Sequence, residues 1–143
     1  MKVKWFLDTN IFMYAAGEEH PLKAPCVGIL RQVAEEALEA VTSTEVLQEI
    51  LYRYGALGEI QRGLRIARLA VDQVGGAVLP VTVRDMQEAF GLLERHGKAI
   101  AVRDAIHAAT MLNNGLTHLL SADTHFDVIT GITRTDPRRA NQR

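Results

Sequence analysis

Short apolar runs recur along the chain and are separated by longer stretches in which apolar residues have helical spacing. The first run, from Val3 to Leu7, is too apolar to alternate, which predicts a strand buried on both faces of a parallel sheet. Shorter runs at residues 40–42, 77–81 and 117–120 predict three further strands. The first strand is expected to be central.

The stretches between these strands predict helices, because apolar residues recur three or four positions apart. Ser43 or Thr44 can cap one of them, and Thr82 with Asp85 resembles a capping box. The helices are predicted over residues 26–38, 46–54, 60–71, 82–96 and 102–113. Since strands and helices alternate regularly and no linker divides them, the sequence predicts one α/β sandwich with a mainly parallel sheet.

The composition is that of one globular domain. At 143 residues, the chain is long enough to bury a sizeable core. No apolar run approaches the roughly 18 residues of a membrane span, and the predicted first strand begins too early for a signal peptide to precede it. The lone Cys26 can form no internal disulfide, which suits a reducing compartment. We therefore expect a soluble, cytoplasmic protein that does not associate with membranes.

The formal net charge of −1 excludes no class of partner, since it averages over faces whose charge can differ. The C-terminal segment, residues 134–143, is locally basic, with four arginines against one aspartate. It could contact RNA phosphates, but a solvated, frayed terminus is the favoured interpretation. We therefore divide the chain into a single domain at residues 1–133 and a basic tail at residues 134–143.

Four acidic residues each fall where a predicted strand ends or a predicted helix begins: Asp8, Glu49, Asp104 and Asp123. Taken singly, each has an ordinary explanation as a helix cap, a partner of a helix dipole, a turn residue or part of a solvated helix face. Taken together they favour a common site, because crossover connections bring strand ends and the following helix starts to one edge of a parallel sheet. Asp8 and Asp123 are then expected at the ends of neighbouring strands.

Glu45 is the alternative to Glu49 in this set, because residues four apart are neighbours on a helix. Ile50 and Leu51 follow Glu49 directly and bring it near the buried stripe of its helix. Glu45, in the first turn, suits a solvated role beside the helix dipole. We therefore prefer Glu49.

Gathering such charges is costly, since two unit charges about 4 Å apart repel by about 4 kcal/mol at an effective dielectric near 20. A cation would offset this repulsion. His107 shares a predicted helix face with Asp104, but we interpret it as a packed or hydrogen-bonded histidine. With oxygen ligands alone, the cluster favours Mg²⁺ or Mn²⁺ over zinc, and a metal-bound water could attack a phosphodiester.

Four motifs resemble those of PIN-domain ribonucleases, in order and separation, over essentially the whole chain. They are Asp8-Thr9-Asn10, Ser43 with Glu49 in the segment TSTEVLQE, Arg103-Asp104-Ala-Ile-His107-Ala-Ala, and Ser121-Ala-Asp123-Thr-His-Phe126-Asp127. One Asp-Thr-Asn alone is a weak signal, whereas four motifs in register are a strong one. Among these ribonucleases, the chain most resembles the VapC toxins of bacterial and archaeal toxin–antitoxin pairs.

The resemblance implies a PIN-like three-layer sandwich and a site whose ligands to one or two Mg²⁺ or Mn²⁺ ions are Asp8, Glu49, Asp104 and Asp123. Asp127 is implied as an additional, outer carboxylate. Asn10 and Ser121 would orient ligands or water, with turn chemistry as the alternative for both. Arg103, beside the acidic pocket, is a weak candidate for an RNA phosphate contact, with a solvated charge as the default.

The resemblance also implies partners: an RNA substrate, a cognate VapB-like antitoxin that covers the acidic pocket, and a second copy of the chain in a homodimer. The implied reaction is endoribonucleolytic hydrolysis that leaves 5′-phosphate and 3′-hydroxyl ends. A PIN-like protein-binding module without catalysis is the alternative, but all four acidic positions are filled, which favours the enzyme. A haloacid-dehalogenase-like phosphatase is disfavoured, because it would need an aspartate where Asn10 stands.

Overall fold

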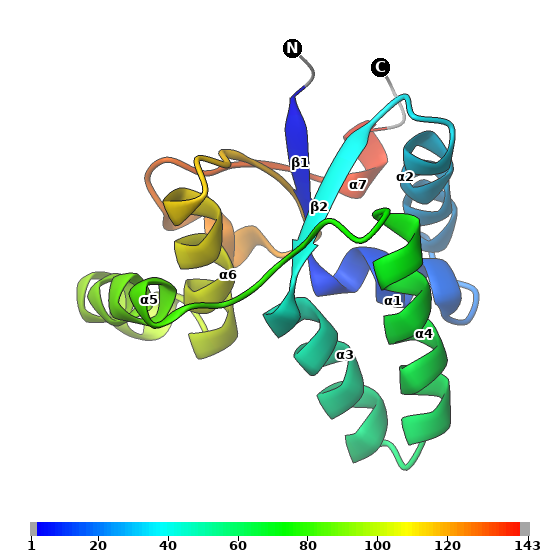
Figure 1. Ribbon diagram of the computed structural model, residues 1–143, viewed down its shortest axis with the longest axis horizontal. Helices are drawn as coiled ribbons and strands as arrows, with labels where there is room; N and C mark the ends of the chain where they lie inside the picture. The colour runs from blue at the N-terminus through cyan, green and yellow to red at the C-terminus, as the bar shows by residue number, and fades with distance from the viewer. Residues whose placement is uncertain (1–2, 141–143) are drawn as a thin grey trace.

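The computed structural model describes residues 3–140 and has a five-stranded parallel sheet at its centre (Figure 1). The order of the strands is β3-β2-β1-β4-β5. The first strand therefore lies in the middle of the sheet, which confirms its predicted central place. The strands are β1 (Lys4–Leu7), β2 (Glu39–Ser43), β3 (Val78–Leu79), β4 (His118–Leu120) and β5 (Thr133–Thr135).

Helices cover both faces of this sheet. They are α1 (Thr9–Ala16), α2 (Lys23–Ala34), α3 (Thr44–Ala56), α4 (Ile60–Gln73), α5 (Val83–His96), α6 (Val102–Asn113) and α7 (Pro137–Ala140), with short 3₁₀ turns η1 (Gly97–Ala99) and η2 (Thr124–Val128). Figure 1 shows α5 and α6 on one side of the sheet and α2 and α4 on the other, while α3 extends from its lower edge. The predicted three-layer α/β sandwich is confirmed.

The core forms on both faces of β1, where Phe6 and Leu7 are completely buried. Burial on both faces explains why this strand is apolar at consecutive positions. α6 is also deeply placed, since every residue from Asp104 to Met111 is buried. No helix within residues 3–140 is long and apolar enough to cross a membrane.

Helix caps fix where two of the helices begin. The Ser43 side chain accepts a hydrogen bond from the Val46 amide, so α3 starts directly after β2. Thr82 and Asp85 form the predicted capping box at the start of α5, with bonds of 2.9 and 3.2 Å. Because such caps satisfy amides that have no partner inside the helix, they set the register of the residues that follow.

The basic C-terminal segment does not form a frayed tail over its described part. Residues 133–135 form the edge strand β5, which pairs in parallel with β4, and α7 follows it with Pro137 and Ala140 buried. α7 packs against α2. The prediction of a solvated terminus is therefore wrong for residues 134–140, because pairing with β4 and burial of α7 hold the segment in place. Residues 141–143 lie outside the described residues.

Candidate metal centre

The four predicted acidic residues come from separate elements and lie together at the C-terminal ends of the strands. We call this side of the sheet its C-terminal edge. Asp8 directly follows β1, and Asp123 comes just after β4, which pairs with β1 in parallel register. Glu49 projects from α3, and Asp104 lies in the first turn of α6. Asp8, Glu49 and Asp104 are only 4%, 7% and 4% exposed. Three carboxylates are thus held away from bulk water at one edge.

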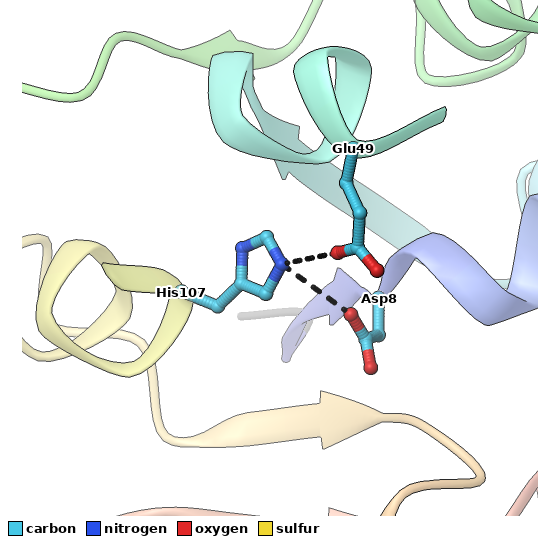
Figure 2. A group of neighbouring side chains, drawn as sticks. All are labelled: Asp8, Glu49 and His107. Atoms are coloured by element: carbon cyan, nitrogen blue, oxygen red, sulfur yellow. Dashed lines mark hydrogen bonds and ion pairs between the residues drawn. The ribbon is translucent and has the colours of Figure 1, made fainter. Parts of the chain in front are cut away.

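Asp8 and Glu49 share a buried group with His107, whose side chain enters from α6 (Figure 2). His107 Nε2 lies 3.1 Å from Glu49 Oε1 and 3.7 Å from Asp8 Oδ1. Candidate ligand atoms of all three residues lie within 4.8 Å of one another. Because His107 is completely buried, its ring is fixed between the two carboxylates.

Three neighbours hold the carboxylate of Asp8. Its Oδ1 accepts a hydrogen bond from the Thr9 amide at 2.8 Å, which caps α1. Its Oδ2 accepts bonds from the Ser121 hydroxyl at 2.6 Å and from the Asn10 amide nitrogen at 3.2 Å. The Ser121 oxygen in turn accepts a bond from the Asp123 amide at 3.0 Å. Asn10 and Ser121 therefore link Asp8 to the loop that carries Asp123, an arrangement that supports an orienting role.

The carboxylate of Glu49 is held on both oxygens. Thr9 Oγ1 donates a hydrogen bond to Oε1 at 2.8 Å, beside the contact from His107. Oε2 forms ion pairs with Arg103 Nε at 3.2 Å and with Arg53 Nε at 3.5 Å. In this structure Arg103 therefore reaches an acidic residue of the site.

Asp104 and Asp123 form a second group with His125, in which candidate ligand atoms also lie within 4.8 Å of one another. His125 Nδ1 lies 3.1 Å from Asp123 Oδ1 and 3.9 Å from Asp104 Oδ2. The side chain of Asp123 is 30% exposed and that of His125 is 64% exposed. Asp123 and His125 are therefore open to solvent, whereas Asp104 and all three residues of the group around His107 are buried.

Burial and mutual repulsion raise the pKa of Asp104 to about 6, since the carboxylates of Asp123 and Asp8 lie nearby. Burial also raises the pKa of Asp8. Burial alone would raise the pKa of Glu49, but hydrogen bonds from His107 and Thr9 lower it below its usual value. Glu49 and Asp8 raise the pKa of His107 despite its burial, because two nearby carboxylates favour a positive charge on the ring.

Asp127 joins neither group. Both of its oxygens accept hydrogen bonds from Arg134, Oδ1 from Nε at 2.8 Å and Oδ2 from a terminal nitrogen at 3.1 Å. Arg134 also donates a bond to the backbone carbonyl of Ser121 at 3.0 Å. Asp127 thus binds Arg134 of β5, and Arg134 also holds the loop after β4 through the Ser121 carbonyl.

The residues at this edge fit a hard divalent cation. The donors are mainly carboxylate oxygens, the ligand type that Mg²⁺ and Mn²⁺ prefer. Within the described part of the chain, one oxygen of Asp104 and one of Asp123 have no protein partner. These oxygens and those of Asp8 and Glu49 could hold such an ion.

Sequence reasoning did not assign His107 or His125 to the site. A signal for His107 was present, since small and apolar residues surround it on a helix and predict burial on all sides. A buried histidine three residues after Asp104 must then find a polar partner, and Glu49 is that partner. His125 gave no comparable signal, because it lies in a turn and is exposed.

A parallel sheet with acidic residues gathered at its C-terminal edge defines a class of α/β proteins whose site lies between strand ends and helix starts. A sequence profile of the PIN domain matches residues 5–132. The chain belongs to the PIN-domain family. Ribonuclease VapC13 of Mycobacterium tuberculosis is 36% identical over 128 residues, which make up 90% of this chain and 96% of the relative. Ribonuclease VapC23 of the same species is 33% identical over 121 residues, 82% of this chain and 91% of the relative.

Solved structures share the fold. VapBC2 from Rickettsia felis, bound to a DNA fragment from its promoter, has a TM-score of 0.72 at 19% identity, covering 94% of this chain and 98% of the other. VapC20 of Mycobacterium tuberculosis, a sarcin-ricin loop cleaving toxin, has a TM-score of 0.69 at 19% identity, covering 87% and 93%. At such identities the likeness concerns the fold alone.

Proposed function

We propose that the protein is a divalent-metal-dependent endoribonuclease that acts as the toxin of a toxin–antitoxin pair. The observation that carries the proposal is the set of carboxylates at the C-terminal edge of the sheet, two of which keep an oxygen without a partner among residues 3–140. The relatives named ribonucleases, which match most of the chain, support RNA as the substrate class.

The carboxylates at the edge would hold Mg²⁺ or Mn²⁺ as a cofactor, the ligands being Asp8, Glu49, Asp104 and Asp123. Such an ion supplies an activated water and neutralises charge as the phosphodiester breaks. Hydrogen bonds of Asn10 and Ser121 would hold the Asp8 carboxylate in place beside the loop that carries Asp123. Thr9 and His107 fix Glu49. Hydrolysis would leave 5′-phosphate and 3′-hydroxyl ends.

The test is cleavage of total cellular RNA by the purified protein freed of any antitoxin. Reactions contain Mg²⁺ or Mn²⁺, and the controls are EDTA and the Asp104→Asn variant. We expect discrete cuts with 5′-phosphate ends that disappear in both controls. Cleavage that survives either control would reject the metal mechanism, and an absence of cleavage with any metal would favour a PIN-like binding module instead.

The proposed partners are a VapB-like antitoxin and a second copy of the chain. Structural neighbours include VapBC and FitAB complexes, some of them bound to DNA, which supports an antitoxin partner. An antitoxin would cover the acidic edge and block RNA. Gel filtration of the purified chain tests the homodimer, and a monomer at micromolar concentration would reject it.

A further inference from the structure

A hollow of about 300 Å³ opens beside the carboxylate of Glu49, between α3 and α6. Glu49 therefore belongs both to the metal centre and to the wall of this hollow, which we call the α3–α6 hollow. Its lining residues are Glu45, Gln48, Glu49, Tyr52 and Arg53 from α3, and Val102, Arg103 and Ile106 from α6. A group bound there would lie next to the carboxylate of Glu49.

The guanidinium groups of Arg53 and Arg103 line the hollow and have N–H donors available for a ligand. Arg53 and Arg103 both reach Glu49 Oε2 through Nε, and their side chains are 46% and 47% exposed. Within residues 3–140, no hydrogen bond or ion pair uses the terminal nitrogens of either group. Those nitrogens form a planar fork that suits the oxygens of a phosphate.

The hollow also has an aromatic wall. Tyr52 precedes Arg53 on α3 and is 68% exposed, although tyrosine usually buries most of its ring. Val102, on the facing helix, is 61% exposed. Aromatic rings next to cationic side chains are the usual platform for a single-stranded nucleotide, because every base can stack on them. The hollow therefore offers contacts for both halves of a nucleotide.

We propose that the α3–α6 hollow binds one nucleotide of the RNA strand next to the phosphodiester that is cut. Tyr52 stacks on the base, and Arg53 and Arg103 bind the phosphate of that nucleotide. The terminal nitrogens can bind the phosphate while Nε stays on Glu49 Oε2, and Thr9 and His107 hold the other oxygen of Glu49. This subsite rests on the proposed ribonuclease function and extends it.

The test measures the affinity of a fluorescent single-stranded RNA that carries the mapped cleavage site. All proteins contain Asp104→Asn with Mg²⁺ present, so that the RNA stays intact. Tyr52→Ala should weaken binding about 5-fold or more, while Tyr52→Phe stays within about 2-fold because the ring remains. Phe90→Ala is the matched control, since Phe90 is an aromatic of α5 that is 55% exposed and does not line the hollow.

The salt dependence of binding tests the phosphate contact separately. Arg103→Gln should lower the slope of log affinity against log salt by about 0.7, the value for one phosphate contact on a single strand. Tyr52→Ala should leave that slope unchanged. Circular dichroism of each variant checks that it folds.

Three outcomes would overturn the subsite. Tyr52→Ala could bind RNA as Phe90→Ala does, Arg103→Gln could keep the full salt slope, or Tyr52→Ala could change only the oligomeric state or antitoxin binding. The last result would assign this face to a protein partner. Cleavage by the unmodified protein in the same buffer tests the proposed function independently. Cleavage with no effect of Tyr52→Ala would reject the subsite alone, whereas no cleavage and no RNA binding would reject both.

Discussion

Asp104 is almost completely buried beside other carboxylates, and replacing it with asparagine tests whether these groups repel one another in the metal-free protein. Asparagine has nearly the same shape and can still accept the bond from the Ala101 amide, which is 3.4 Å long. Burial, Asp123 and Asp8 together raise the pKa of Asp104 from 3.8 to about 6. Keeping this group ionised therefore costs folding free energy at neutral pH.

The size of that cost follows from the shift in pKa. About 2 pH units correspond to about 3 kcal/mol, because one unit is worth about 1.4 kcal/mol. Below pH 3.8 the group is protonated in both the folded and the unfolded chain, and its ionisation costs no stability. Stability is then lost as the pH rises through about 6, and the loss persists above it. Asparagine does not titrate, so the variant avoids this loss.

Thermal melts in EDTA measure the effect. At pH 8, Asp104→Asn should be about 1–3 kcal/mol more stable than the unmodified protein, which corresponds to a Tm about 3–10 °C higher. The gap should shrink towards pH 5. Asp72→Asn, at an exposed position of α4, controls for the loss of one negative charge. Added Mg²⁺ should raise the Tm of the unmodified protein more than that of Asp104→Asn.

A lower Tm for Asp104→Asn in EDTA at pH 8 would refute the reasoning, because removal of a repelling charge would then have no benefit. A gap that stays constant between pH 5 and pH 8 would refute it as well, since ionisation of Asp104 could not be its cause.

Further substitutions test the supports of the site. Arg134→Ala should lower stability by about 1–3 kcal/mol in urea denaturation and slow RNA cleavage, because it frees Asp127 and the Ser121 carbonyl. Arg138→Ala removes only an exposed ion pair and should change stability much less, so equal losses in the two variants would contradict a special role for Arg134. His107→Ala should cost about 2–4 kcal/mol in the same assay, since it leaves a cavity and releases Glu49. An unchanged denaturation midpoint would show that the His107 ring does not stabilise the fold. Ser43→Ala should cost about 1 kcal/mol by removing the cap of α3, with no change in the Tm increase that Mg²⁺ produces.

The regular part of the fold could be predicted from the sequence because its signal is local. β1 is apolar at consecutive positions, and α6 runs from Val102 to Asn113, where the spacing of apolar residues predicts it. The alternation of strands and helices also predicted that Asp8 and Asp123 follow neighbouring strands, and β1 does pair with β4. Crossover topology makes that inference general for parallel sheets.

The edge strand β5 could not be predicted in the same way. Its sequence, Thr133-Arg134-Thr135, is polar, so it has no apolar run to mark it. Pairing with β4 makes this segment a strand, and the ion pair between Arg134 and Asp127 connects it to η2. Those contacts depend on the folded arrangement, and the basic composition of the segment instead suggested a solvated tail.

The hydrogen bonds of the site divide its carboxylate oxygens into two kinds. Both oxygens of Asp8 and both of Glu49 already contact donors of the protein. Asp104 accepts one long hydrogen bond from the Ala101 amide, and His125 lies 3.9 Å away from the same oxygen. Within the described residues, Asp123 contacts donors through only one oxygen. A cation at this edge would therefore gain most from Asp104 and Asp123, while Asp8 and Glu49 stay fixed by their neighbours. Burial and the nearby carboxylates of Asp123 and Asp8 raise the pKa of Asp104, so a cation beside Asp104 would also offset that repulsion.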